Sequence, residues 1–161
     1  MKAEQPDTPK SVTRNLRNLI VAAPLRYKYM YCNMMYTVAT YLVEQMSGLE
    51  FADFLDEYFF RPLGMNSSNL QPKNARAKGL DERIATGYVW DEESGEYRAF
   101  QSPDTPEAQG AGSIITSVND YIKYVKAMMN HEAPLNEDVY KWLIKSRTLQ
   151  DPSYGTLRPY T

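Results

Sequence analysis

The sequence predicts a mainly α-helical protein, a single helical domain with one small β-hairpin. Several stretches carry apolar residues at the three- and four-residue spacing of an amphipathic helix, and one stretch is aromatic-rich on both sides of a turn. A chain of 161 residues fits one domain, which at this size buries roughly 70% of the surface of its unfolded form. We therefore expect residues 1–161 to form one helical unit, with residues 1–8 and 152–161 irregular or flexible.

Three helices are predicted in the N-terminal third. The first opens at Thr8-Pro9, where the missing N–H of proline costs nothing, and ends at Pro24. The second has Asn33 as its N-cap and Gly48 as its left-handed C-cap. The third follows a capping-box spacing at Ser47–Glu50, so the second and third helices form an αα-hairpin. Their apolar stripes are Val12, Leu16, Leu19 and Ile20; Met34, Met35, Val38, Leu42, Val43 and Met46; and Phe51, Phe54, Leu55, Tyr58 and Phe59.

The rest of the chain is predicted to hold a loop, the hairpin and two further helices. Polar residues, proline and glycine dominate residues 66–81, which indicates a long exposed loop. Residues 84–90 and 96–100 are β-prone and flank a turn sequence, so this hairpin is the only sheet we expect. Ser117 is the predicted cap of one helix, and a last helix spans residues 136–145.

Composition and charge narrow the classes of partner. The formal net charge is −2 and the basic residues are scattered, which argues against nucleic acid and against an anionic membrane surface. The longest apolar run, residues 38–43, is far shorter than the ~20 residues that cross a bilayer. The single cysteine, Cys32, cannot form an internal disulfide, and residues 1–7 lack the apolar core of a signal peptide, so a cytoplasmic location is the default expectation. No Cys, His or acidic spacing indicates a metal, and we expect no cofactor.

The segment Tyr31-Cys32-Asn33 places a phenol and a carboxamide two residues apart, immediately before the second helix. Alone, this pattern carries little information, because Tyr31 could simply pack and Asn33 could simply cap the helix. Cys32 between them is either a reactive thiol in a cleft or a small buried filler. The context of the segment therefore decides its interpretation.

Five segments occur in order between residues 31 and 120. They are Tyr31-Cys32-Asn33, the apolar helix 38–48, Phe51-Ala52-Asp53-Phe54-Leu55, Phe60-Arg61-Pro62-Leu63-Gly64-Met65, and Gly110-Ala111-Gly112-Ser113-Ile114-Ile115-Thr116-Ser117 through Asp120. Together they resemble the class C β-lactamases and the penicillin-binding-protein-like serine hydrolases. The resemblance implies the all-helical subdomain of a β-lactamase or transpeptidase-like protein. In that family the active site combines S-x-x-K, Y-x-N and a late K-T-G or H-x-G.

The resemblance assigns roles to the middle part of that site. Tyr31 would relay the proton of the catalytic serine and Asn33 would hold the substrate, while Gly110, Gly112 and Ser113 would line the cleft. The complete protein would hydrolyse small-molecule or peptide esters and amides. This chain contains no S-x-x-K, K-T-G or H-x-G. We therefore expect a fragment of a serine hydrolase that is inactive alone, because a proton relay without a nucleophile offers no covalent route.

Two other uses of such a chain stay open. It could be a stand-alone binding or assembly module, or it could pair with a separate chain that carries S-x-x-K. Without the α/β half of the resembled family, the helical subdomain would expose an apolar face. Contact with that half, or self-association through this face, is therefore expected.

Overall fold

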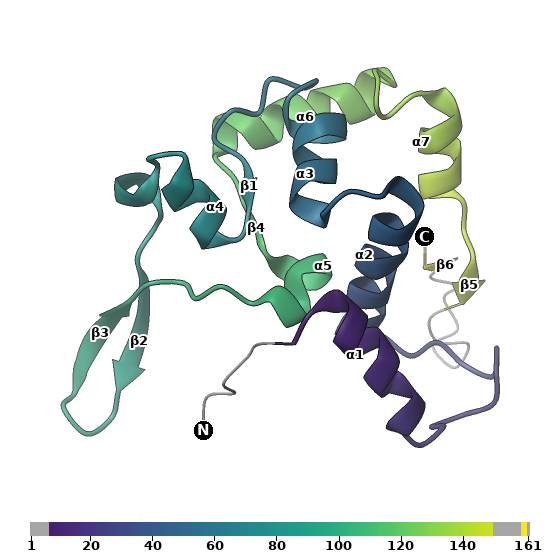
Figure 1. Cartoon of the computed structure of the whole chain (residues 1–161), viewed down its shortest axis with the longest axis horizontal. Helices are drawn as coiled ribbons and strands as arrows, with labels where there is room; N and C mark the ends of the chain where they lie inside the picture. Colours follow the sequence, from purple (N-terminus) through teal and green to yellow (C-terminus); the bar gives the residue numbers. More distant parts are fainter. Residues whose placement is uncertain (1–6, 150–158, 161) are drawn as a thin grey trace.

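The computed structural model describes residues 7–149 and 159–160 (Figure 1). The ends predicted to be irregular, residues 1–8 and 152–161, lie largely outside this range. Helices make up most of the regular structure, which confirms the mainly α prediction. The helices are α1 (Pro9–Asn15), α2 (Asn33–Ser47), α3 (Phe51–Leu55), α4 (Pro72–Ala77), α5 (Gln109–Gly112), α6 (Val118–Asn130) and α7 (Glu137–Ile144); the strands are β1 (Asn69–Leu70), β2 (Gly87–Asp91), β3 (Glu96–Phe100), β4 (Ile114–Ile115), β5 (Thr148–Leu149) and β6 (Pro159–Tyr160).

Helix α2 organises the lower part of the molecule in Figure 1. Helices α1 and α5 pack against it, and α3 follows it directly and contacts β1. The β2–β3 hairpin extends away from the helices as an arm, and α6 runs along the opposite edge. Within the described residues, no helix is both long enough and apolar enough to span a membrane.

The first helix is shorter than predicted. After α1 a single 3₁₀ turn spans Leu16–Asn18, so the helix ends well before Pro24. Leu19 and Ile20, predicted on its apolar face, are 66% and 94% exposed. A short helix gains most of its stability from packing of its apolar face, and these two side chains bury too little surface to extend it.

The caps of the αα-hairpin differ from the prediction at their N-terminal ends. Gly48 closes α2 with φ at 73°, as predicted. The N-cap of α2 is Cys32 and not Asn33, and it makes no side-chain capping bond. The capping box at Ser47 is absent, because Ser47 still belongs to α2 and its hydroxyl donates to the Val43 carbonyl at 2.7 Å. The N-cap of α3 is Glu50.

The largest departure from the prediction is residues 66–81. This supposed exposed loop contains β1 and α4, and residues 68–71 are at most 2% exposed. Strand β1 pairs antiparallel with β4, Asn69 opposite Ile115, so the expectation of a single sheet was also wrong. The polar side chains of this stretch are hydrogen-bonded inside the molecule, a pattern that composition cannot distinguish from a solvated loop.

The remaining elements confirm the sequence signals. Strands β2 and β3 form the predicted hairpin, with Trp90 opposite Tyr97 and their rings 5.1 Å apart. The Ser117 hydroxyl accepts a hydrogen bond from the Asp120 backbone N–H at the start of α6. Asn136 caps α7 in the same way, through the Val139 N–H. These caps depend only on neighbours in sequence, which is why the sequence predicts them.

The apolar core is small. Its buried members are Leu55 from α3, Phe60 from the π-helical stretch Asp56–Phe60 that continues α3, Met65, and Leu70 from β1. Most of the other fully buried side chains are polar, namely Thr37, Thr40, Ser68, Asn69, Gln71, Ser113 and Asp120. Hydrogen bonds therefore hold much of this interior in place.

Candidate active site

The residues of the Y-x-N segment lie at the surface, at the start of α2. Tyr31 precedes the helix and is 57% exposed, with its ring 5.8 Å from the ring of Tyr36. Asn33 is the first residue of α2 and is exposed. Because Cys32 occupies the N-cap position, the Asn33 carboxamide does not cap the helix. Cys32 is itself exposed, so its interpretation as a buried filler was wrong.

The glycine-rich segment packs on the same helix, one to two turns further along. A Cβ atom at Gly110 would lie 2.3 Å from the carbonyl oxygen of Tyr36 and 2.3 Å from Oγ1 of Thr40. Tyr36 follows Asn33 by three residues, about 4.5 Å along the helix axis. Just before α5, the Glu107 carbonyl accepts a hydrogen bond from Thr37 Oγ1 at 2.9 Å. The segment before and through α5 is therefore pinned against the beginning of α2.

The other end of this segment is fixed by Gln71. Its side-chain amide donates to the Thr105 carbonyl at 3.0 Å, and its side-chain oxygen accepts from the Thr105 N–H at 2.9 Å. The backbone N–H of Gln71 donates to the Ser113 carbonyl at 2.8 Å, and the hydroxyls of Thr105 and Ser113 lie 3.1 Å apart. One buried residue thus joins the first and last residues of the stretch 105–113.

A second polar cluster lies between the β1–β4 pair and α6. The carboxylate of Asp120, 4% exposed, accepts from the Ser67 N–H at 2.7 Å, from Ser68 Oγ at 3.1 Å and from Lys123 Nζ at 3.1 Å. Burial raises the pKa of Asp120, but the bonds from Lys123, Ser67 and Ser68 outweigh it, and the pKa lies below its ordinary value. Ser68 also bonds Thr116 at 2.8 Å. Asp120 therefore anchors the residues before β1 to α6, and Ser68 links them to the residue after β4.

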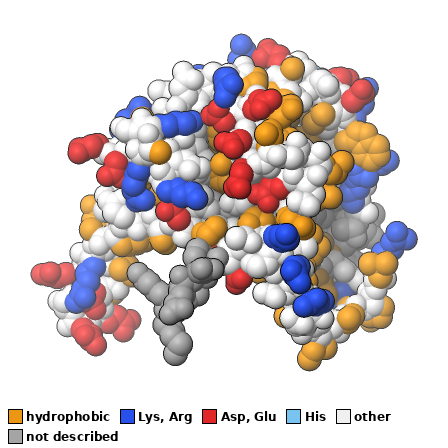
Figure 2. Space-filling model, in the orientation of Figure 1, with side chains coloured by type: hydrophobic (Ala, Val, Ile, Leu, Met, Phe, Trp, Pro, Cys, Tyr) orange, Lys and Arg blue, Asp and Glu red, His pale blue; other side chains and the backbone are white. Residues whose placement is uncertain are grey.

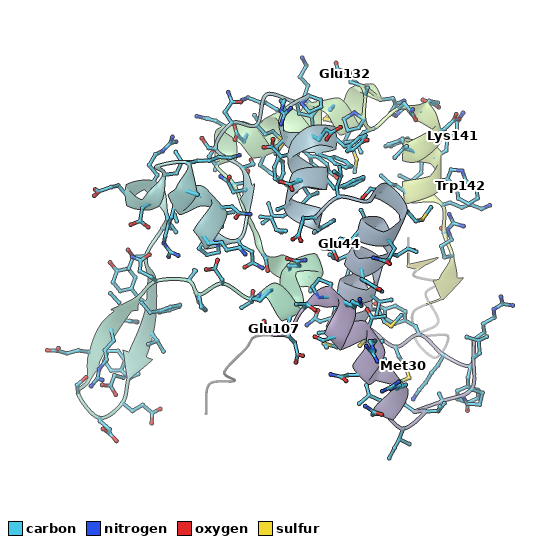
Figure 3. All side chains as sticks on the ribbon, viewed as in Figure 1. Met30, Glu44, Glu107, Glu132, Lys141 and Trp142 are labelled. Carbon is cyan, nitrogen blue, oxygen red and sulfur yellow. The ribbon has the colours of Figure 1, made fainter. Side chains whose placement is uncertain are left out.

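Glu44 joins three helices at the far end of α2 (Figure 3). Its carboxylate accepts from the Phe51 N–H at 3.3 Å and from the Gln109 side chain at 3.4 Å. Burial raises the pKa of Glu44, and the nearby charge of Glu50 adds to the rise, while those two hydrogen bonds oppose it. Helix α5 is therefore held on α2 at two places, by the packing of Gly110 and by the bond from Gln109 to Glu44.

The predicted site residues thus divide into two groups. Gly110 and Ser113 are packed into the joint with α2 and β1, whereas Tyr31, Asn33 and Gly112 lie at the surface. The space around a Cβ at Gly112 is open. The sequence did not indicate Gln71 or Thr105 at all, since these two residues bond each other and lie 34 positions apart. From the sequence, Asp120 stood out only as the last residue of the resembling segment 110–120.

Comparison with known proteins gives the class of this chain. The profile of the Beta-lactamase family matches residues 1–156. The unguisins hydrolase ungD of Aspergillus violaceofuscus is 41% identical over 134 residues, which are 81% of this chain and 23% of that protein. The D-aminopeptidase of Brucella anthropi is 28% identical over 158 residues, 96% of this chain and 27% of that protein. The octameric penicillin-binding protein homologue of Pyrococcus abyssi shares the fold over 86% of this chain and 30% of its own, with a TM-score of 0.70 and 24% identity.

These matches confirm the resemblance seen in the motifs. The chain belongs to the β-lactamase family, with relatives among the penicillin-binding-protein-like and D-aminopeptidase-like serine hydrolases. It covers only 23% and 27% of the length of the two relatives compared by sequence.

Proposed function

We propose that this chain supplies the Y-x-N part of a serine hydrolase site, with Tyr31 as the proton relay and Asn33 as a substrate-holding amide. The observation that carries the proposal is the setting of Tyr31. It lies within a stretch of exposed apolar side chains, the apolar segment 19–36: Leu19, Ile20, Val21, Leu25, Tyr27, Met30, Tyr31, Met34, Met35 and Tyr36. Exposed apolar surface of this kind is typical of a face that another domain or another protein covers.

Proton transfer to Tyr31 requires groups that such a covering domain or protein would supply. A tyrosine with an ordinary pKa near ~10 accepts a serine proton at neutral pH only when nearby cations stabilise its phenolate. The S-x-x-K lysine would provide such a cation and its serine the nucleophile, and both would meet Tyr31 across the apolar segment. The exposed Asn33 carboxamide, two residues after Tyr31, can donate to a substrate carbonyl.

The relatives support a substrate class. The name D-aminopeptidase points to peptide hydrolysis, and the name unguisins hydrolase points to hydrolysis of unguisins. We propose amide or peptide hydrolysis for the complete protein to which this chain contributes, through an ester formed on the serine. The surface position of Gly112 supports a role in lining the cleft. For Gly110 and Ser113 the packing supports a role in holding that lining in place.

Intact-mass spectrometry of the chain after incubation with a penicillin and, separately, with a fluorophosphonate tests the proposal. We expect no adduct, because the chain has no S-x-x-K serine. A stoichiometric adduct on one serine that disappears in Tyr31→Phe would contradict the missing nucleophile. The Tyr58→Phe variant, at another half-exposed tyrosine, is the matched control.

A stand-alone binding or assembly module is the second candidate. The same apolar segment favours it, with Ile20, Leu25 and Val21 at 94%, 90% and 83% exposed. Under this function the occupant of the segment is a second copy of the chain. Sedimentation velocity over a wide range of concentration tests the module: concentration-dependent size supports it, and a monomer throughout argues against it.

A further inference from the structure

A pocket of about 420 Å³ lies between α3 and α4, and no residue of the Tyr31–Asn33 turn or of the apolar segment 19–36 lines it. Phe51, Phe60 and Leu70 form its apolar part, and the buried residues Asn69 and Gln71 contribute amides. Small-molecule sites in proteins combine these features, a volume of roughly 300–1,000 Å³ with apolar walls and a few placed polar groups.

The charges of the pocket are divided between its two walls. Glu50, Asp53 and Asp56 line it from α3 and the residues flanking that helix, and Lys73 and Lys78 line it from α4 and its C-cap. Figure 2 shows this face, with acidic side chains over α3 at the centre and basic side chains over α4 beside them. A ligand in the pocket therefore meets opposite charge on opposite sides.

Only part of this charge is already neutralised within the protein. Asp56 accepts from Lys78 at 3.1 Å and from Arg61 at 2.8 Å, and the bonds from Arg61 and Lys78 lower the pKa of Asp56. In the described part of the chain, no ion pair involves Glu50, Asp53 or Lys73. The charges of Asp56 and Lys78 thus balance each other, and Glu50, Asp53 and Lys73 supply further charge of both signs.

One of the residues that line the pocket, Gln71, has a strained backbone conformation. Gln71 has φ of 68° and ψ of 145°, a combination that residues with a Cβ rarely adopt, yet it is 2% exposed and fixed by hydrogen bonds to Thr105 and Ser113. Strained backbone of this kind concentrates at ligand and active sites, where the surroundings enforce it.

We infer that the α3–α4 pocket binds a small zwitterion, a ligand with a free ammonium and a free carboxylate. The ammonium lies against Asp53 and Glu50, the carboxylate lies against Lys73, and an apolar side chain rests on Phe51 and Leu70. A free α-amino acid and a short peptide share this chemistry. The inference does not depend on a catalytic role for Tyr31.

The test is an NMR titration of the intact chain with alanylphenylalanine, with its N-acetyl and C-amide forms, and with free phenylalanine. We expect saturable shifts in α3 and α4, with a Kd of about 1 mM or tighter for the better of the two free zwitterions. Blocking either terminus of the dipeptide should weaken binding roughly two- to fivefold, the effect of one exposed charge pair. Tighter binding by phenylalanine or by the dipeptide identifies the source of the ligand.

Variants assign each charge. Lys73→Gln should remove the difference between the dipeptide and its amide, and Asp53→Asn should remove the difference between the dipeptide and its N-acetyl form. Lys126→Gln and Glu92→Gln, exposed and outside the pocket, are matched controls. Tyr31→Phe should bind normally, which separates this result from the proposed hydrolase role. An absence of saturable shifts, or differences unchanged in Lys73→Gln and Asp53→Asn, would overturn the inference.

Discussion

The joint between α2, α5 and β1 and the apolar segment 19–36 are built in opposite ways. The joint is buried and polar, with Thr37 and Gln71 bonded to Glu107 and Thr105, which are 70 and 34 residues away in the chain. The segment is apolar and exposed, up to 94% at Ile20.

This contrast separates the part of the chain that its own residues stabilise from the part that they leave exposed. Buried hydrogen bonds fix geometry only when every partner is present, and no buried side-chain donor or acceptor in the described residues lacks one. Apolar surface needs only area, which another body can provide. The joint is therefore complete within the described chain, whereas the apolar segment is the part for which we propose a partner.

Gly110→Ala is the strongest way to break the joint. The new methyl group would meet the Tyr36 carbonyl at 2.3 Å, and backbone cannot yield cheaply, so we expect a loss of roughly 3 kcal/mol in the free energy of unfolding. Gly112→Ala, where the space is open, should change it by less than ~0.5 kcal/mol. Urea unfolding measures both, and equal losses in the two variants would mean that the close contact is not what stabilises the joint.

Asp120→Asn tests the hydrogen-bonded anchor and its dependence on pH. At pH 7 we expect a loss of about 2 kcal/mol, the scale of hydrogen bonds to a charged group. The pKa of Asp120 is lowered in the folded chain, so its contribution is complete above the unfolded pKa near ~3.9 and is lost as the pH falls through the lower folded value. Unfolding of both proteins from pH 7 to pH 2 measures this, and a difference independent of pH would contradict it.

Substituting the apolar segment tests the dependent half of the comparison. The double variant Ile20→Lys, Leu25→Lys should weaken any self-association on the order of tenfold, equal to ~1.4 kcal/mol. It should leave the stability of the monomer nearly unchanged, because both side chains are at least 90% exposed. The matched variant Val118→Lys, 82% exposed on α6, should leave association unaltered. Equal effects of the two variants in sedimentation equilibrium would show that association does not use this segment.

Glu44→Gln should give the smallest effect and the opposite pH trend. Burial raises the pKa of Glu44, so its favourable contribution is present below the unfolded pKa and is lost as the pH rises through the folded value. Glutamine keeps an oxygen for the Phe51 N–H, so the variant should match the parent at pH 4 and exceed it by no more than ~0.5 kcal/mol at pH 7. Thermal unfolding at the two pH values measures this. A variant less stable than the parent at pH 7 would mean that the charge itself strengthens the joint.

Local signals explain what the sequence could predict. Gly48 at the end of α2, Ser117 before α6 and the turn between β2 and β3 act on neighbours, and each was recognised from a few adjacent residues. Residues 66–81 were missed because their burial depends on partners such as Thr105 and Asp120, 34 to 53 residues away. The Y-x-N segment could be located, but its exposure could not, since that depends on which surfaces of the chain are covered.

We propose Tyr31 as the proton relay of a hydrolase whose nucleophilic serine lies outside this chain. The most direct measurement replaces the matching 134 residues of the Aspergillus violaceofuscus unguisins hydrolase with those of this chain and follows unguisin hydrolysis. In a chimera shown to be folded by circular dichroism, we predict activity that Tyr31→Phe lowers at least ~10²-fold in kcat/KM, while Tyr58→Phe leaves it unchanged. A folded, active chimera that hydrolyses at the same rate with Tyr31→Phe would contradict the account.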